Sequence, residues 1–193
     1  NPAPARLIAI GGPSGTGTSV LAAMLAHHLG AAPGAVHLRS DLERKALFGV
    51  SPLGRLPPPA YASGVTARVY AVLRNKARAI LLAGHSAILD ATWLDQAERA
   101  SLATFAGQAG VPFTGIWLSA DQHILETRVS QRRGDASDAD VAVVRQQVER
   151  LNAPTDWVQV DAAGSPDQTC RQALHHLTGP QTTAGRAKAC PDA

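Results

Sequence analysis

The residue types with the clearest chemistry form one glycine-rich segment near the start of the chain. In order, its residues are Gly12, Pro13, Ser14, Gly15, Thr16, Gly17, Thr18 and Ser19. The segment follows an apolar run at 6–10 and precedes a helical pattern, which is the context that a phosphate-binding loop requires. Glycines let the backbone wrap a phosphate and aim its N–H groups inward, and the helix N-terminus adds positive potential. Ser19 is placed to ligate Mg²⁺. The segment therefore predicts a nucleotide phosphate site, with a glycine-rich turn that binds nothing as the alternative.

One position of this loop departs from the phosphate-binding pattern. Where the pattern has a lysine before the final Ser or Thr, this chain has Thr18. A lysine there would bind the β- and γ-phosphates and neutralise charge during transfer. Since a charge-assisted hydrogen bond contributes about 1.5–3 kcal/mol, its loss weakens nucleotide binding roughly tenfold to a hundredfold. Three explanations stay open: an engineered inactivating change, a natural loss in a degenerate enzyme, and a loss that an arginine elsewhere offsets.

A second chemical cluster follows the apolar segment 36–38. Asp41 could take the proton from an acceptor hydroxyl, and Arg44, one helical turn later, could hold an anionic group of the acceptor. The alternative is structural. Ser40 is a good helix N-cap with Glu43 three residues on, which is the capping-box spacing, and Asp41 then lies in the first turn. Because the cluster stands beside a phosphate loop, we favour the catalytic interpretation.

Two further clusters carry an acid and three arginines. Asp90 ends a predicted strand, where an acid can hold Mg²⁺ or orient the acceptor, or can simply end the strand in a turn. Arg128 and Arg132 are four residues apart and share a helix face, and Arg133 precedes a polar turn at 134–138 that could act as a lid. We expect Arg128 and Arg133 to stabilise charge on a transferring phosphoryl group. The alternative is a solvated basic helix end.

These clusters need a scaffold that brings the ends of strands together. Apolar runs predict strands at 6–10, 36–38, 87–90, 113–118 and 157–160. Helical periodicity predicts helices at 20–29, 40–48, 61–82, 94–109, 121–133, 141–151 and 167–177, with an irregular proline-rich loop at 49–60. This alternation predicts an α/β fold, a five-stranded, mostly parallel sheet with helices on both faces and the ligand at the carboxyl ends of the strands. We expect one domain over residues 1–178 and a flexible tail at 179–193.

Composition excludes several classes of protein. The 193 residues are 45% hydrophobic and 17% charged, which excludes a disordered chain and a coiled coil. No apolar run reaches the roughly 18 residues of a membrane span and no signal-peptide pattern opens the chain, so we expect no membrane partner. Two cysteines without metal-ligand spacing favour a cytoplasmic protein. A net charge of +3 predicts no general nucleic-acid coat, although Arg44, Lys45 and Arg55 leave a polynucleotide acceptor open.

Together these residues resemble a known family. The loop GGPSGTGTS, the stretch HLRSDLERK, the strand end LDATW and the helix end RVSQRRGDAS are similar to those of P-loop kinases of the polynucleotide kinase and zeta-toxin type. To about residue 177, the chain resembles more closely the ATP-binding kinase-like domain that follows an aminoglycoside-phosphotransferase-like domain in some bacterial two-domain proteins. The resemblance implies a P-loop NTPase fold with a sheet of the nucleotide-kinase order, Mg·ATP as donor and a hydroxyl as acceptor.

The resemblance also implies roles for single residues. It implies a phosphate cradle at 12–19, an acceptor base at Asp41, an acceptor clamp at Arg44 and a Mg²⁺ or acceptor contact at Asp90. Its lid arginines correspond to Arg128 and Arg133.

Three hypotheses about function follow from these residues. The first is a kinase that transfers the γ-phosphate of ATP to a hydroxyl of a small molecule or of a nucleic-acid end, impaired by Thr18. The second is a non-catalytic ATP- or GTP-binding module that regulates a companion domain of a larger protein. The third is a structural remnant whose nucleotide site is dead. Thr18 favours the second and third hypotheses. The joint presence of Asp41, Arg44, Asp90 and Arg133 favours the first.

Overall fold

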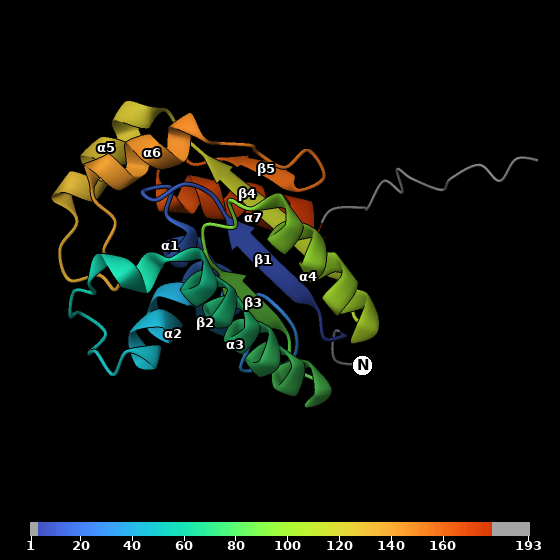
Figure 1. The fold of residues 1–193 in the computed structure, drawn as a ribbon. Coiled ribbons are helices and arrows are strands. Elements are labelled where there is room, and N and C mark those ends of the chain that lie inside the picture. Colours follow the sequence, from blue (N-terminus) through green and yellow to red (C-terminus); the bar gives the residue numbers. More distant parts are fainter. Residues whose placement is uncertain (1–3, 179–193) are drawn as a thin grey trace, which may run out of the picture.

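Five strands form one parallel sheet in the computed structural model, which describes residues 4–178 (Figure 1). They are β1 (Leu7–Gly11), β2 (Val36–Arg39), β3 (Ala87–Asp90), β4 (Phe113–Ser119) and β5 (Val158–Asp161), in the order β2-β3-β1-β4-β5. All four neighbouring pairs are parallel. The predicted α/β fold with a five-stranded sheet is confirmed. The tail predicted at 179–193 lies outside the described residues.

Helices cover both faces of this sheet. They are α1 (Thr18–Ala26), α2 (Ser40–Leu47), the short 3-10 helix η1 (Pro58–Tyr61), α3 (Ser63–Leu82), α4 (Gln96–Gln108), α5 (Gln122–Gln131), α6 (Val141–Glu149) and α7 (Pro166–Thr178). Helices α3 and α4 lie on one face, and α1 and α7 on the other (Figure 1). Helices α5 and α6 pack on each other through a small cluster of their own. In the described part of the chain, each helix is too short or too polar to cross a membrane.

The central strand β1 explains why the apolar runs mark the strands so clearly. Leu7 and Ala9 belong to the core under α3 and α4, whereas Ile8 and Ile10 belong to the core over α1 and α7. Successive side chains of a strand point to opposite faces, so a strand that is covered on both sides is apolar throughout. All five strand predictions therefore agree with the structure within one residue.

Helix boundaries differ more, and each difference has a local cause. The predicted helix 20–29 begins earlier, at Thr18, because the glycine loop ends directly in it. The predicted helix 61–82 begins at Ser63, because η1 fills the preceding turn. The predicted helix 94–109 begins after Asp95, whose carboxylate accepts a hydrogen bond from the Glu98 N–H at 3.0 Å.

The capping box predicted at Ser40 is wrong. Ser40 is already the first residue of α2, and Arg39 occupies the cap position in an extended conformation. The reason lies in the sheet. Strand β2 stays paired with β3 up to the register Arg39↔Asp90, so the chain passes from strand to helix without a separate capping residue. This direct passage brings the start of α2 next to the ends of β1 and β3.

Candidate active site

The glycine-rich loop joins the end of β1 to the start of α1 and has a fixed shape. The Thr16 N–H and hydroxyl both donate to the Pro13 carbonyl, at 3.2 and 2.8 Å. Gly17 precedes α1 with φ 89, and Gly12 has φ 148. A Cβ on Gly12 would lie 2.5 Å from the Leu118 carbonyl oxygen of β4, so only glycine fits there. The first N–H groups of α1 lack partners within the helix and are available to a bound anion.

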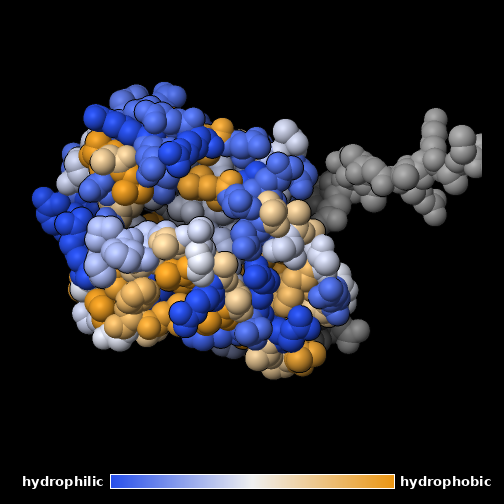
Figure 2. All heavy atoms as spheres, viewed as in Figure 1, coloured by the Kyte–Doolittle hydropathy of each residue, from blue (hydrophilic) through white to orange (hydrophobic). Residues whose placement is uncertain are grey.

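Helices α5 and α6 lie directly on this loop. A Cβ on Gly15 would stand 2.9 Å from the Leu125 carbonyl oxygen and 3.2 Å from Val129 of α5. The Ser14 N–H donates to the Gln147 side-chain oxygen of α6 at 2.8 Å. Helices α5 and α6 and the segment 132–140, which connects them, are called the lid below. Figure 2 shows that the surface of the lid is mostly hydrophilic.

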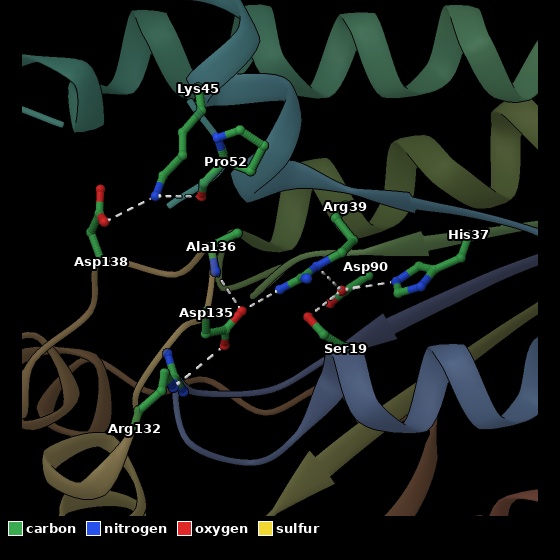
Figure 3. Close-up of polar contacts among 10 residues, drawn as sticks. All are labelled: Ser19, His37, Arg39, Lys45, Pro52, Asp90, Arg132, Asp135, Ala136 and Asp138. Carbon is green, nitrogen blue, oxygen red and sulfur yellow. Dashed lines mark hydrogen bonds and ion pairs between the residues drawn. The ribbon is translucent and has the colours of Figure 1, made fainter. Parts of the chain in front are cut away.

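Asp90, at the end of β3, gathers three polar side chains (Figure 3). The Ser19 hydroxyl donates to Asp90 Oδ2 at 2.5 Å, His37 Nε2 lies 3.0 Å from the same oxygen, and Arg39 Nε lies 3.6 Å from it. Asp90 is only 4% exposed. The structure thus brings together the two residues, Ser19 and Asp90, that were predicted as metal ligands.

The Ser19 and Asp90 oxygens fit Mg²⁺ but not a metal held by protein alone. Mg²⁺ prefers oxygen ligands and is commonly bound by one or two protein groups, with phosphates and water completing its shell. Among residues 4–178, no group of three or more His, Cys, Asp or Glu side chains could hold a metal ion. Ser19 and Asp90 would therefore hold Mg²⁺ only together with a bound phosphate.

Asp41 lies in the first turn of α2, on the wall of the same cavity. Burial raises the pKa of its carboxyl from 3.8 to about 6, and the negative charges of Asp90 and Asp135 raise it further, while Arg39 and Arg44 oppose them. A carboxyl whose pKa lies this close to neutral pH is mostly ionised there and is a stronger base than an ordinary carboxylate, so it can act as a general base.

Arg44 is buried at 6% exposure behind Asp41. Its guanidinium donates to the Ala60 carbonyl at 2.7 Å and to the Thr66 hydroxyl at 3.3 Å, and it lies 5.0 Å from the centre of the Tyr61 ring. These contacts hold Arg44 between α2, η1 and the start of α3, where it lines the cavity. Its Nε atom is buried without a hydrogen-bond partner among the described residues, and its contact with an acceptor stays a prediction.

Arg128 and Arg133, the two predicted lid arginines, have their donors occupied by carbonyl groups. Arg128 bonds the three successive carbonyls of residues 162–164 after β5, at 2.7, 3.1 and 3.0 Å. The exposed Arg133 bonds the carbonyls of Ser130 and Arg132. Both line the cavity, but Arg128 holds α5 against the segment after β5 in this arrangement. Their role in phosphoryl transfer stays a prediction.

A buried lysine ties the proline-rich loop to the lid. Lys45, 1% exposed, donates to the Pro52 carbonyl at 3.0 Å and to Asp138 Oδ1 at 3.2 Å. The other Asp138 oxygen accepts hydrogen bonds from the Leu56 N–H at 3.0 Å and the Tyr61 hydroxyl at 2.7 Å. Asp138 therefore fastens the segment after α5 to α2 and to the loop that follows it.

The cavity that these residues line measures about 1340 Å³. The phosphate loop, Ser19 and Asp90 line it together with side chains of α3 and α4. Asp41 and Arg44 of α2 also line it. This arrangement can place a phosphate chain at the loop and a second molecule beside Asp41.

Comparison with known proteins identifies the family. The family model described as "AAA domain" matches residues 7–154, which contain the loop, Asp41, Asp90 and the lid. The chain belongs to the AAA domain family.

Relatives of this AAA domain include longer proteins. It is 31% identical over 177 residues to Rv2004c of Mycobacterium tuberculosis and to Mb2027c of Mycobacterium bovis. Each alignment covers 88% of this chain but only 34% of the relative. The chain thus spans about a third of the length of the curated relatives that it matches.

Solved structures with the same fold include two kinases and the protein Kti12. A gluconokinase from Sinorhizobium meliloti is 20% identical with a TM-score of 0.64, covering 90% of this chain and 91% of that one. The APS kinase CysC of M. tuberculosis in complex with AMPPNP and APS is 17% identical, with a TM-score of 0.60 and coverage of 91% and 99%. Kti12 of Chaetomium thermophilum in complex with ADP-AlF3 is 18% identical, with a TM-score of 0.60 and coverage of 90% and 100%. These likenesses establish a kinase-like P-loop fold for the AAA domain.

Three polar residues of this AAA domain take part in the site although the sequence motifs did not indicate a role for them. Arg39 ends β2 and reaches both Asp90 and Asp135, which lies in the segment after α5. Arg132 lies beside Asp135. The sequence predicts a role in phosphoryl transfer for its neighbours Arg128 and Arg133 but not for Arg132 itself. The strand alternation around Arg39 could have indicated that its side chain shares a face with His37, but only the fold places Asp135 opposite it.

Proposed function

We propose that this chain is an ATP-dependent phosphotransferase that transfers the γ-phosphate of Mg·ATP to a hydroxyl of a small molecule. The observation that carries the proposal is the position of Asp41. This carboxyl lies in one cavity with the phosphate loop and the Ser19–Asp90 pair, and its pKa of about 6 suits a general base near neutral pH. A nucleotide-binding loop alone would not require a base at that place.

The residues divide the work as follows. The loop amides and the start of α1 bind the phosphates, and Asp41 accepts the proton of the acceptor hydroxyl. The acceptor oxygen then forms a bond to the γ-phosphorus, the bond from that phosphorus to the β–γ bridging oxygen breaks, and ADP leaves. Mg²⁺, when held by Ser19 and Asp90, would neutralise charge on the phosphate oxygens. Arg44 lowers the pKa of Asp41 and can orient the acceptor beside it.

A small acceptor is favoured over a nucleic-acid end. Of the three basic residues expected to line a channel beside the proline-rich loop, Arg44 and Lys45 are buried and bonded within the protein, and Arg55 alone is exposed. Binding to nucleic acid rests mainly on cations that reach the phosphate backbone. The cavity wall formed by α3 and α4 instead presents hydroxyl groups and the ion pair of Arg74 with Glu98, which suit a compact, hydroxylated molecule.

The proposal is tested by following ADP release in a coupled assay with Mg·ATP. The probes are a panel of sugars, polyols and nucleosides, together with an oligonucleotide bearing a 5′-hydroxyl. We expect ADP release that depends on one of the small acceptors, and its loss in Asp41→Asn, which keeps the shape of the side chain but cannot act as a base. The proposal fails if no acceptor stimulates ADP release by this protein or by Thr18→Lys, or if Asp41→Asn remains fully active.

A non-catalytic nucleotide-binding module is the second candidate, and Thr18 is the observation that favours it. Without the lysine, the loop can bind phosphates through its amides while it transfers them poorly. If the chain is such a module, the unaltered protein and Asp41→Asn should bind Mg·ATP equally well, and neither should release ADP with any acceptor.

We also infer that the chain serves as the ATP-binding part of a longer protein, in keeping with the 34% of the relatives' length that it matches. Its resemblance to the ATP-binding kinase-like domain that follows an aminoglycoside-phosphotransferase-like domain in some bacterial two-domain proteins supports the same assignment. Expression of a full-length relative such as Rv2004c, followed by the ADP assay with and without the segment outside the match, tests whether the two parts influence each other. Identical ADP release from both would contradict a regulatory connection.

A further inference from the structure

The phosphate loop lacks one positive charge because Thr18 replaces a lysine of the phosphate-binding pattern. Several arginines that line the cavity could supply this charge. These are Arg44, Arg74, Arg128, Arg132, Arg133 and Arg150. Arg128 and Arg133 bond carbonyl groups, and Arg74 pairs with Glu98. Arg44 has a buried Nε without a hydrogen-bond partner among the described residues, but its bonds to Ala60 and Thr66 hold it to η1 and α3. Arg150 lies beyond the end of α6, and its side chain is exposed. Among these arginines, Arg132 directly follows the helix that packs on the phosphate loop, and we take it as the candidate.

Arg132 stands at the end of the helix that touches the phosphate loop. Helix α5 packs on Gly15 through Leu125 and Val129, and Arg132 follows Val129 by three residues. Its side chain is 22% exposed. Its Nη1 atom is buried and has no hydrogen-bond partner among the residues that the structure describes. A buried donor without a hydrogen bond lowers the stability of the fold. A bound anion that accepts a hydrogen bond from this guanidinium would remove that penalty.

A single carboxylate holds Arg132 in place and is shared with a second arginine. Asp135 Oδ2 lies 3.5 Å from Arg132 Nε, and Asp135 Oδ1 accepts a hydrogen bond from Arg39 Nη2 at 2.7 Å. Figure 3 shows Arg39, Asp135 and Arg132 in a row that leads from Asp90 to the lid. Arg39 Nε is likewise buried without a hydrogen-bond partner among the described residues, although it lies 3.6 Å from Asp90. The row thus offers two guanidinium groups with unused donors next to a predicted phosphate site.

We propose that Arg132, positioned by Asp135, replaces the lysine that the phosphate loop lacks at Thr18. Its guanidinium donates to the terminal phosphates of the bound nucleotide and supplies the missing charge from the lid. A guanidinium is well suited to this role because its planar fork binds phosphate oxygens in pairs. The inference rests on the proposed function, since it requires a nucleotide at the loop. It also explains how a loop with Thr18 can stay functional.

A double-mutant cycle tests this replacement, because two groups that do the same work are not additive. Mg·ATP is titrated calorimetrically into the protein, Arg132→Ala, Thr18→Lys and the double variant. We expect Arg132→Ala to weaken binding at least tenfold when residue 18 is threonine, and less than threefold when residue 18 is lysine. Arg132→Gln, which keeps the length of the side chain without its charge, should behave as Arg132→Ala does.

The matched control is Arg145→Ala. Arg145 lies on α6, and its side chain is 60% exposed and paired with Glu126 of α5. Its loss removes a positive charge from the lid but none from the cavity lining, so affinity for Mg·ATP should stay within twofold. A loss equal to that of Arg132→Ala would mean that general charge or lid stability, and not the lysine replacement, sets the affinity.

The remaining outcomes separate this inference from the proposed function. Equal losses from Arg132→Ala in both backgrounds, or no loss in either, overturn the replacement while leaving nucleotide binding intact. Binding by Thr18→Lys but not by the unaltered protein also overturns it, because Arg132 would then supply nothing. Absence of binding to both proteins overturns the proposed function itself. Circular dichroism of Arg132→Ala and Arg132→Gln identifies a variant that has lost its fold, and the other variant then decides.

Discussion

Replacing Asp41 with asparagine should stabilise the fold at neutral and alkaline pH while abolishing transfer. Burial raises the pKa of the Asp41 carboxyl from 3.8 to about 6, with the charge of Asp90 adding to burial and the charges of Arg39 and Arg44 opposing it. Because the folded-state pKa lies above the unfolded-state value, the unfolded chain loses the proton first as pH rises. The free energy of unfolding therefore falls between roughly pH 4 and pH 6 and stays lower above that range.

The size of this effect follows from the same pKa. A difference of about two pKa units corresponds to about 3 kcal/mol, and water in the cavity makes this an upper value. Asparagine has the same shape and no such penalty. At pH 8, Asp41→Asn should exceed the unaltered protein in stability by about 1–3 kcal/mol, and near pH 4 the two should be nearly equal.

Urea denaturation of both proteins at pH 4 and pH 8, followed by circular dichroism, measures the difference directly. The acidic measurement is an internal control, because Asp41 is then neutral in the folded protein and only partly ionised in the unfolded chain, which leaves a difference below about 1 kcal/mol. An asparagine variant that is less stable than the unaltered protein at pH 8, or a difference that does not change with pH, would refute the reasoning that the fold holds a charged Asp41 at a cost.

Three further predictions concern the lid and the metal site. Asp138→Ala leaves Lys45 buried without its carboxylate and should lower the free energy of unfolding by about 3–5 kcal/mol in urea denaturation, and a loss below about 1 kcal/mol would contradict the buried pair. Gly15→Ala places a Cβ 2.9 Å from the Leu125 carbonyl at a residue with φ 94, so it should cost about 1–3 kcal/mol and weaken Mg·ATP binding, and unchanged thermal stability would contradict the contact of α5 with the loop. Ser19→Ala should remove the gain in ATP affinity that Mg²⁺ gives the unaltered protein, as measured by calorimetry with and without Mg²⁺, and a persistent gain would exclude Ser19 as a ligand.

The sheet could be predicted closely from the sequence, and the helix starts less well. Strand β1 is covered on both faces and must be apolar throughout, and β3 is apolar up to Asp90, so their bounds are visible as apolar runs. Helix starts depend on what precedes them in space. The start of α2 follows from the pairing of Arg39 with Asp90 on a neighbouring strand, which no local pattern around Ser40 contains.

The candidate site divides in the same way. The meeting of Ser19 with Asp90 could be predicted, because Asp90 ends β3 and Ser19 lies in the first turn of the helix that follows β1, so both lie at the carboxyl edge of the sheet. The partners of the individual basic side chains could not be predicted. Arg44 and Lys45 are adjacent in the sequence and both are buried, yet one reaches η1 and α3 and the other reaches Asp138 of the lid. Such long side chains find partners that are distant in sequence, so spacing alone does not decide their roles.

The most direct test of the central claim, that the loop at 12–19 binds Mg·ATP, is a calorimetric titration of Mg·ATP into this protein and into Thr18→Lys. We predict one binding event per chain in both proteins, with binding in Thr18→Lys tighter by no more than about tenfold, because the added lysine contributes a charge-assisted hydrogen bond that partly repeats the charge of Arg132. The absence of binding heat in both proteins, with the fold intact by circular dichroism, would contradict the claim.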